Sequence, residues 1–408
     1  MKIIIVGSGF GGLACAKALG GSSHQVLVMD KNNHNLFQPL LYQVATGALS
    51  PADIAEPIRR VLKRYANVSV VMAEVERIDT TARQVFSTDG GQHSYDVLVL
   101  ATGSRYSYFG HDDWAQYATG LKTIENARLI RSRLLSAFER AEKSRDPDEQ
   151  RRLMTTVVIG GGPTGVEMAG AIAELGRWTL EGEFRNIDPK FARVLLVEGG
   201  ERILPQFPQE LADYAQRELQ RLGVELLVRH GVTQIDAQGV TIGSEHIGAG
   251  TIVWGAGVSA TPVAQWLGVE GDRTGRIAVG PDMSVPGLPG VYALGDIAAF
   301  MQDGKPLPGL AQVAKQQGRH LGRALRSAAS PNDTLPPFRF HDRGNTAVIG
   351  RHAAVFDFGR YHMKGGLAWL LWAVVHVYLL VNAEKRALVS LQWLWRYISK
   401  ARGVRLIP

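Results

Sequence analysis

Two glycine-rich sequences in this chain have the residue types and the spacing needed to hold phosphate groups. The first is Gly7-Ser8-Gly9-Phe10-Gly11-Gly12, and the second is Gly160-Gly161-Gly162-Pro163-Thr164-Gly165. In a Gly-x-Gly-x-x-Gly turn the first glycine makes the bend, the second lets the backbone approach a pyrophosphate, and the third lets a helix pack against a strand. The N-terminus of that helix then faces the phosphates. One such motif is a weak signal, whereas two predict two nucleotide sites.

An acidic residue completes each motif. Asp30 ends the predicted strand 25–29, and Glu198 ends the predicted strand 193–197. A carboxylate in this position accepts hydrogen bonds from ribose hydroxyls. Glu198 would face the extra phosphate of NADPH without an adjacent cation, which favours NADH. Arg202, four residues further on, leaves NADPH open.

The elements that position these residues form a repeated unit of strand, glycine turn, helix and strand. Further apolar strands at 96–100, 251–254 and 290–294 end at glycine turns, as buried parallel strands do at a ligand crevice. We therefore predict an α/β protein with two Rossmann-like dinucleotide-binding domains, the second inserted in the first. The predicted boundaries are 1–124 with 281–340 for the first domain, 125–280 for the second, and 341–408 for a C-terminal helical segment that associates with a membrane. Residues 125–152 read as a charged helical connection that breaks at 146–148.

Composition excludes several kinds of chemistry. The chain has 408 residues, among them 46 glycines and a single cysteine, Cys15. One cysteine allows no intramolecular disulfide, no cysteine-rich metal cluster and no two-thiol redox centre, and we predict no metal site. It also agrees with a reducing, cytoplasmic setting. Because Met1 leads directly into an apolar strand, we expect no targeting peptide before the fold.

The net charge of +7 lies in the C-terminal part. Residues 343–408 contain ten Lys and Arg and two acids, so the rest of the chain is close to neutral. The same segment holds four of the eight tryptophans. A basic, tryptophan-rich tail on a neutral body favours an anionic lipid surface as partner over nucleic acid.

Two apolar stretches in the tail predict how it meets a membrane. Residues 365–383 are uncharged and have basic residues on both sides, so nothing orients a single spanning helix. Beyond them, one helical face would carry Leu388, Leu391, Trp395 and Ile398, and the opposite face Lys385, Arg396 and Lys400. This is the pattern of a helix that lies in the membrane interface. We expect monotopic attachment rather than a transmembrane helix.

The repeated unit resembles that of flavoproteins with two dinucleotide-binding domains, one for FAD and one for NAD(P)H. Most disulfide-reducing members carry a cysteine pair after the first acid, whereas residues 35–43 here contain no cysteine. Cys15 lies inside the first helix and reads as a core residue. The resemblance therefore implies that electrons pass from nicotinamide to flavin and on to a diffusible acceptor.

Within that group the chain resembles the type II NADH:quinone oxidoreductases over nearly its whole length. Residues 37–47 are similar to the family's flavin-side loop, and 101–103 and 295–296 to its further FAD contacts, with Asp296 near the ribityl and phosphate groups. Gly165-Val166-Glu167 resembles the motif whose acid lines the family's cavity for flavin, nicotinamide and quinone. Residues 311–316 resemble its quinone-side AQxAxQ motif.

Gln312, Gln316 and Glu167 each allow a second interpretation. The two glutamines are four residues apart on a helix and share a face, so their amides could donate to quinone carbonyls or simply face solvent. Gln317 points elsewhere and is expected to face solvent. Glu167 could line the cavity, or it could be an acid stabilised by the helix dipole.

The expected activity is hydride transfer from NADH to bound FAD, followed by transfer of two electrons to a membrane quinone without proton pumping. The alternatives are a soluble NADH-dependent flavoprotein that reduces a small electron-carrier protein, and a redox-sensing flavoprotein of low turnover. The expected location is the cytoplasmic face of the cell membrane, with a homodimer as an open alternative. The expected catalytic residues are Glu167, Gln312 and Gln316. The expected cofactor-binding residues are Gly7, Gly9, Phe10, Gly11, Gly12, Asp30, Lys31, Thr46, Ala101, Thr102, Gly103, Gly295 and Asp296 for FAD, and Gly160, Gly162, Pro163, Thr164, Gly165, Glu198 and Gly257 for NADH.

Overall fold

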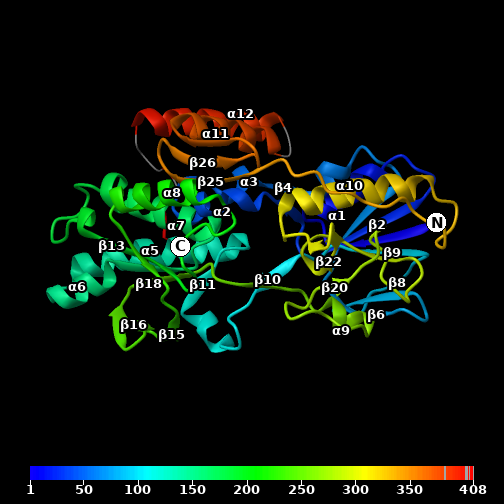
Figure 1. Cartoon of the computed structure of the whole chain (residues 1–408), viewed down its shortest axis with the longest axis horizontal. Coiled ribbons are helices and arrows are strands. Elements are labelled where there is room, and N and C mark those ends of the chain that lie inside the picture. The colour runs from blue at the N-terminus through cyan, green and yellow to red at the C-terminus, as the bar shows by residue number, and fades with distance from the viewer. Residues whose placement is uncertain (381–382, 400–402, 404, 408) are drawn as a thin grey trace. The chain divides into compact units, whose positions relative to one another are not determined.

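The structure is a computed structural model and describes residues 1–380, 383–399, 403 and 405–407. The chain forms two compact units (Figure 1). Unit 1 consists of residues 1–36, 55–105 and 258–343, and unit 2 of residues 37–54, 106–257 and 344–408.

Unit 1 is built on a five-stranded parallel sheet whose strand order is β21-β9-β1-β2-β5. Its strands are β1 (Lys2–Val6), β2 (Gln25–Asp30), β5 (Val68–Met72), β9 (Val97–Leu100) and β21 (Val291–Ala293). β1, β9 and β21 are short apolar runs buried over almost their whole length, as parallel strands in α/β proteins are, whereas in β5, at one edge of the sheet, only Val70 is buried. The main helices of the unit are α1 (Phe10–Leu19), α4 (Ile58–Leu62), α9 (Val263–Leu267) and α10 (Ala311–Ser327).

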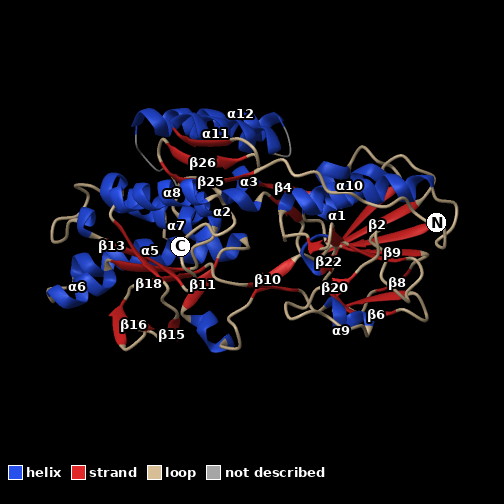
Figure 2. Cartoon of the chain, in the orientation of Figure 1, coloured by secondary structure: helices blue, strands red, loops and turns tan. Residues whose placement is uncertain are grey.

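Five small sheets of two or three strands complete this part of the chain (Figure 2). They are formed by β3 (His34–Leu36) with β4 (Ala55–Pro57), β6 (Val75–Asp79) with β7 (Gln84–Ser87) and β8 (Gln92–Ser94), β10 (Ser104–Tyr106) with β19 (Val258–Ala260), β20 (Ile277–Ala278) with β22 (Ala298–Ala299), and β23 (Met301–Gln302) with β24 (Lys305–Pro306).

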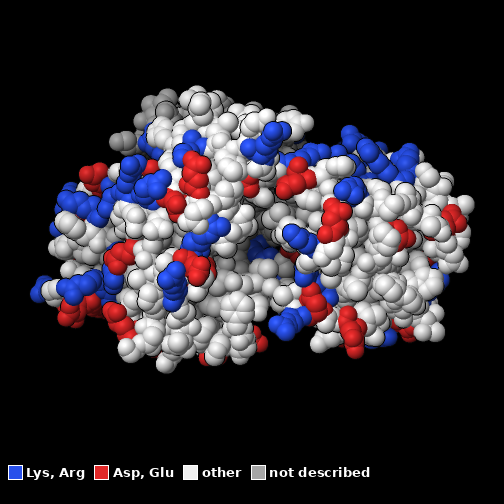
Figure 3. All heavy atoms as spheres, viewed as in Figure 1, with Lys and Arg blue, Asp and Glu red and all other residues white. Residues whose placement is uncertain are grey.

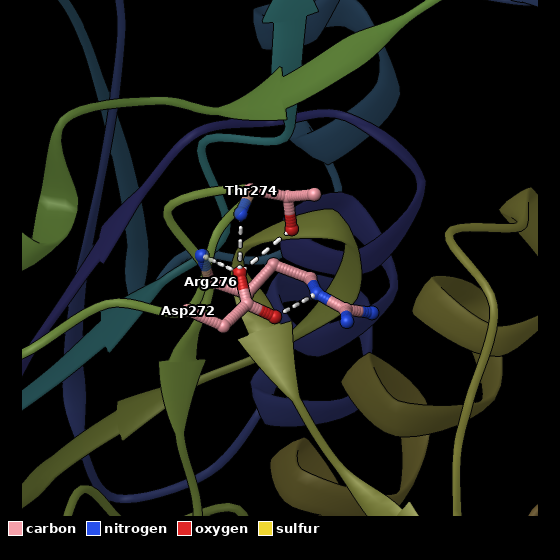
Figure 4. Close-up of polar contacts among 3 residues, drawn as sticks. All are labelled: Asp272, Thr274 and Arg276. Atoms are coloured by element: carbon pink, nitrogen blue, oxygen red, sulfur yellow. Dashed lines mark hydrogen bonds and ion pairs between the residues drawn. The ribbon is translucent and has the colours of Figure 1, made fainter.

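Figure 4 shows the turn that leads from α9 into β20. One oxygen of the Asp272 carboxylate accepts hydrogen bonds from the backbone N–H groups of Thr274 and Arg276 and from the Thr274 hydroxyl, and the other oxygen pairs with the Arg276 guanidinium. Although partial burial opposes it, this set of donors lowers the pKa of Asp272 to about 2. The carboxylate therefore stays ionised and fixes the turn.

Unit 2 repeats the design with a parallel sheet whose strand order is β11-β18-β12-β13-β14. Its strands are β11 (Ala118–Gly120), β12 (Thr155–Ile159), β13 (Arg193–Glu198), β14 (Val224–Val228) and β18 (Thr251–Trp254). The helices are α2 (Leu41–Ala45), α3 (Pro51–Ile54), α5 (Ile124–Lys143), α6 (Pro147–Leu153), α7 (Pro163–Glu174) and α8 (Gln209–Arg221). A three-stranded antiparallel sheet comprises β15 (Val232–Ile235), β16 (Gly239–Ile242) and β17 (Glu245–Gly248).

The C-terminal part belongs to unit 2. An antiparallel sheet of β25 (Asn345–Gly350), β26 (Ala353–Asp357) and β27 (His362–Gly365) precedes α11 (Gly366–Leu379) and α12 (Ala383–Ser399). The sheet packs on α7, where a Cβ on Gly170 would lie 1.7 Å from the carbonyl oxygen of Ile349. Among the helices that the structure describes, none is long and apolar enough to span a membrane.

The fold class and the two strand–turn–helix–strand units are confirmed. The compact units differ from the predicted boundaries in four places. Residues 37–54 and 106–124 join unit 2, the latter because β11 extends its sheet. Residues 258–280 join unit 1, and the tail belongs to unit 2 rather than forming a segment of its own. Lys400, with the side chains of Arg396 and Ile398, lies outside the described residues.

Candidate functional site

The first glycine motif joins β1 to α1, and three of its four glycines have no room for a side chain. A Cβ on Gly7 would lie 2.4 Å from the Ala101 carbonyl oxygen, and a Cβ on Gly12 would lie 1.8 Å from that of Gly7. At Gly9, in contrast, a Cβ would meet nothing within 4 Å. No side chain caps the N-terminus of α1. The turn is therefore tight where the chain packs on itself and open where a pyrophosphate would approach.

Asp30 holds the same turn from the end of β2. One carboxylate oxygen accepts the backbone N–H of Ser8 at 2.6 Å and its hydroxyl at 2.7 Å, and the other accepts the Asn32 N–H. Asn35 donates to the Ser8 carbonyl at 2.6 Å. The free lone pairs of Asp30 are those that would accept ribose hydroxyls.

The remaining FAD candidates of unit 1 follow β9 and β21, whose carboxyl ends lie at the same edge of the sheet as that of β1. A Cβ on Gly103, which has a φ of +71°, would meet nothing within 4 Å. The Ser104 hydroxyl donates to Asp296 at 2.5 Å, and the hydroxyls of Thr102 and Thr261 lie 2.5 Å apart. Open backbone positions beside an oriented carboxylate fit one bound dinucleotide such as FAD.

The second motif, between β12 and α7, has the same design. A Cβ on Gly165 would lie 1.8 Å from the Gly160 carbonyl oxygen, whereas one on Gly162 would meet nothing within 4 Å. The two oxygens of Glu198 accept the backbone N–H groups of Gly161 and Gly200, each at 2.6 Å. A Cβ on Gly257 would lie 2.5 Å from the Phe109 ring. The turn in unit 2 is thus tight where the chain packs on itself and open at Gly162, like the first turn.

Gln312 and Gln316 hold residues 341–343 in unit 1. Gln312 donates to Asp342 and accepts the Arg343 backbone N–H, while Gln316 bonds to both the N–H and the carbonyl of His341. Gln317 does not face solvent as expected. It is only 1% exposed and accepts the Gly295 backbone N–H at 2.8 Å. Helix α10 directs the Gln317 side chain toward the carboxyl ends of the strands in the unit 1 sheet. There its amide oxygen, rather than water, accepts the Gly295 backbone N–H.

A cavity of about 160 Å³ lies within unit 2, walled by α2, α7, β25, α11 and α12. A cavity on this order of size can hold one aromatic ring. Its lining includes Tyr42, Gln43, Glu167, Trp369, Trp372 and Trp393. Five of its lining residues are aromatic, and polar groups that include Glu174 and Arg351 converge on the same space, a combination found in small-molecule sites.

Glu167 is one of two acids that line this cavity, the other being Glu174, which accepts the backbone N–H of Arg351. Although the Glu167 side chain is partly exposed, packing around the carboxylate desolvates it and raises the pKa of Glu167 to about 8, against the opposing effect of the Val348 backbone N–H, which donates to it at 3.3 Å. Because α7 begins at Pro163, Glu167 lies beyond the first turn, where the helix dipole has little effect. The side chain therefore holds a proton at neutral pH.

Three aromatic rings in the C-terminal helices form a stack at the cavity. Trp372 lies between His376 and Trp393, with ring centroids 4.4 Å and 5.2 Å away. Trp393 donates its indole N–H to Gln43, which donates to the Tyr42 hydroxyl, both at 2.9 Å. Burial lowers the pKa of His376 to about 4, so its ring is neutral.

The tryptophans are the cavity residues that sequence reasoning assigned elsewhere. Trp369, Trp372 and Trp393 were expected to meet lipid, yet they line the cavity. The one available signal was that Trp393 falls outside the apolar stripe of its helix, whereas Leu388, Leu391 and Trp395 are exposed as expected.

Cys15 is buried, and burial raises the pKa of its thiol to about 12, so it is unreactive. Among the described residues, no three His, Cys, Asp or Glu side chains are grouped to hold a metal ion.

Comparison with known proteins decides the family. Residues 1–318 match the family described as pyridine nucleotide-disulphide oxidoreductase, and residues 343–400 match the NDH2 C-terminal domain. The chain is 40% identical to the type II NADH:quinone oxidoreductase Ndh of Mycobacterium tuberculosis, over 98% of this chain and 89% of that protein. This chain belongs to the type II NADH:quinone oxidoreductase family.

Other relatives agree. NdhA of the same organism, also a type II NADH:quinone oxidoreductase, is 41% identical over 98% of this chain and 88% of its own length. The NDH2 structure from Plasmodium falciparum in complex with NADH has the same fold, with a TM-score of 0.90 and 21% identity over 99% of both chains.

Proposed function

We propose that this member of the family reduces its quinone in the cavity of unit 2. As a type II NADH:quinone oxidoreductase it takes electrons from NADH through FAD and gives them to a quinone. The observation that supports this cavity is the meeting of aromatic walls with a protonated carboxyl group at Glu167. Flat, apolar walls suit a quinone ring, and a neutral acid can donate a hydrogen bond to its carbonyl without the cost of burying a charge.

The residues at the two glycine turns would hold the nucleotides. In unit 1, Gly9 and Gly103 leave room for FAD, and the Asp30 carboxylate would accept hydrogen bonds from the ribose hydroxyls of FAD. In unit 2, Gly162 leaves room for NADH and Glu198 would accept from its ribose, which favours NADH over NADPH. When bound, FAD accepts a hydride from NADH and supplies two electrons to the quinone.

The overall reaction, NADH + H⁺ + quinone → NAD⁺ + quinol, consumes one proton besides the hydride that NADH supplies. Glu167 holds a proton at its carboxyl group and can donate it to a quinone oxygen as the negative charge develops there. The Glu167 side chain is partly exposed, so its carboxylate can be protonated again from solvent before the next turnover. Gln43, fixed between Trp393 and Tyr42, would orient the aromatic wall around the ring.

Gln312 and Gln316 have a positioning role in this proposal, through residues 341–343. Gln316→Leu should then slow quinone reduction while sparing electron transfer to a small artificial oxidant that meets the flavin directly. Equal loss with both acceptors would instead assign Gln316 to the flavin site or to the fold. The wild-type chain, assayed with both acceptors, provides the reference.

We also propose that the chain attaches to the surface of a membrane, at its cytoplasmic face, by α11 and α12. Apolar side chains of both helices are exposed, among them Leu367, Leu370, Val374, Leu391, Leu394 and Trp395. Exposed apolar faces of this extent mark an interaction site. Co-sedimentation with phospholipid vesicles tests the proposal, and failure of the full chain to sediment would favour a soluble reductase.

A further inference from the structure

Helix α10 in unit 1 has one face of cations and one face of core residues. Its buried positions are Val313, Ala314, Gln317, Gly318, Leu321, Gly322 and Leu325. Lys315, Arg319, Arg323 and Arg326 follow each other at intervals of four, four and three residues, which places them on the same face of a helix. Residues 311–327 contain no acid. The helix therefore presents a stripe of positive charge and has no acid of its own beside it.

The packing of α10 on α1 fixes the direction of that stripe. A Cβ on Gly318 would lie 2.0 Å from the Gly11 carbonyl oxygen, and one on Gly322 would lie 2.6 Å from that of Cys15. Only glycine allows the two backbones to come this close, so α10 cannot turn its cations inward. Arg326 bonds to the carbonyls at the end of α1, which ties it to the fold.

A second group of cations, on and after α4, adjoins the first. Arg59, Arg60, Lys63 and Arg64 are exposed, and residues 58–66 contain no acid. The end of α1 joins the two groups, because a Cβ on Gly20 would lie 2.2 Å from the Tyr65 ring and Arg326 bonds to the Gly20 carbonyl. On the same helix, burial and the charges of Lys315 and Arg64 lower the pKa of Lys17. Nearby Glu56 is only 3% exposed and accepts Arg60 at 3.2 Å. In Figure 3, Lys and Arg side chains gather at this edge of unit 1.

We propose that this cationic face, formed by Lys17, Arg59, Lys63, Arg64, Lys315, Arg319 and Arg323, binds the headgroups of anionic phospholipids. The inference rests on the proposed attachment to a membrane and adds a second contact, made by the FAD-binding unit, to the apolar contact made by α11 and α12. Stable attachment to a lipid surface commonly needs two signals, one apolar and one electrostatic. The body of the chain is near neutral overall, so this cluster is a local feature of the fold rather than a consequence of net charge.

The chemistry of the face favours lipid over nucleic acid. Proteins that bind single strands without sequence preference interleave cations with aromatic rings on which bases stack. Here Tyr65 is the aromatic residue beside the cations, and its hydroxyl accepts a hydrogen bond from the Arg64 guanidinium, which also lies 4.8 Å from the ring centroid. On α10 the ring of His320 packs against Phe338 and bonds to the Pro336 carbonyl, so it is not presented to a base. A layer of phosphates, in contrast, requires only charge.

The test replaces four exposed cations of the face, Arg59, Lys63, Arg319 and Arg323, by Gln in the full-length holoenzyme. Arg64 and Arg326 are kept because they form contacts within the fold. The matched control replaces four exposed cations outside α4 and α10, namely Arg145, Arg217, Arg273 and Lys305, by Gln. Both proteins lose the same charge. Binding is measured with vesicles of phosphatidylcholine alone and of equal parts phosphatidylcholine and phosphatidylglycerol, at low and high salt.

We expect the face variant to bind the anionic vesicles up to roughly a thousandfold more weakly than the control, because each of the four cations contributes about 1 kcal/mol near an anionic surface. The difference should vanish on neutral vesicles and at high salt. Equal binding of face and control variants to anionic vesicles would overturn the proposal. So would a face variant that loses retention on single-stranded DNA while its vesicle binding is unchanged.

Activity with a water-soluble quinone, measured on the same proteins, distinguishes failure of the cationic face from failure of the proposed function. Neither variant alters a residue of the nucleotide turns or the cavity, so both should reduce a water-soluble quinone with NADH at the wild-type rate. If the wild-type chain itself failed to reduce any quinone, the proposed function would fall. If only the vesicle measurements showed no difference, the cationic face alone would be refuted.

Discussion

The indole N–H of Trp393 in α12 donates a hydrogen bond to the side-chain carbonyl of Gln43 in α2, with 2.9 Å between the two heavy atoms. Two segments separated by some 350 residues of sequence are thereby joined at the wall of one cavity. Lys385 and Gln392 of the same helix bond to Ala52 and Asp53. The helix with the exposed apolar face is therefore also part of the cavity.

Trp393→Phe should remove this hydrogen bond while keeping the ring on Trp372. The net value of one hydrogen bond is about 1 kcal/mol, so we expect roughly a fivefold slower reoxidation of the reduced enzyme by quinone. Reduction of the flavin by NADH should not change. Trp395→Phe, an exposed position on the same helix, is the control, and a similar slowing there would assign the effect to α12 as a whole.

Glu167→Gln should alter two pH dependences. The protonated acid is the proton donor, so the wild-type rate of quinone reduction should fall as the pH rises through about 8, and the variant should lose that transition. The pKa is raised in the folded state, so between about pH 4.5 and 8 the folded chain binds the proton that the unfolded chain releases, and stability falls as pH rises. Urea unfolding at several pH values should show a flatter profile for Glu167→Gln.

Gly9→Val and Gly162→Val form a matched pair for the two nucleotide turns. A Cβ at either position meets no protein atom within 4 Å, so both proteins should fold. The first should be isolated without FAD, whereas the second should be yellow and bind NADH poorly. Absorbance of the purified proteins and NADH titration check this. A Gly9→Val protein with one FAD per chain would refute the assignment of the first turn.

Glu198→Gln should weaken NADH and leave FAD bound, because Glu198 holds the second turn and Asp30 the first. Hydrogen bonds to a charged group contribute about 1.5–3 kcal/mol, which corresponds to roughly a ten- to hundredfold higher KM for NADH. Asp30→Asn should instead weaken FAD binding and leave the KM for NADH unchanged. If NADPH supported turnover of the wild-type chain as well as NADH does, the discrimination assigned to Glu198 would be wrong.

Local patterns were sufficient to predict the nucleotide turns. The glycine spacing, the apolar strands and the acids at 30 and 198 each belong to one continuous unit, and the structure places Asp30 against Ser8 and Glu198 against Gly161. The break at 146–148 was also local, since Asp146 caps the helix that Pro147 begins.

The cavity could not be predicted in the same way, because its walls come from α2, α7, β25, α11 and α12. A sequence reader sees tryptophans near basic residues and infers lipid contact, and only tertiary packing separates inward Trp393 from outward Trp395. Gln317 was misplaced for a related reason. Its partner, the Gly295 N–H, lies on another element, and burial of an amide depends on that partner.

The most direct test of the cavity as the quinone site is to fill it. Ala48 lines the cavity, and Ala48→Trp should occupy the space that the quinone ring needs; Ala82→Trp, at an exposed turn, is the control. Each protein is reduced anaerobically by NADH and then mixed with quinone in a stopped-flow instrument. The account predicts that all proteins are reduced by NADH at the wild-type rate, and that only Ala48→Trp fails to be reoxidised rapidly by quinone. Rapid, wild-type reoxidation of a fully folded Ala48→Trp protein would contradict it.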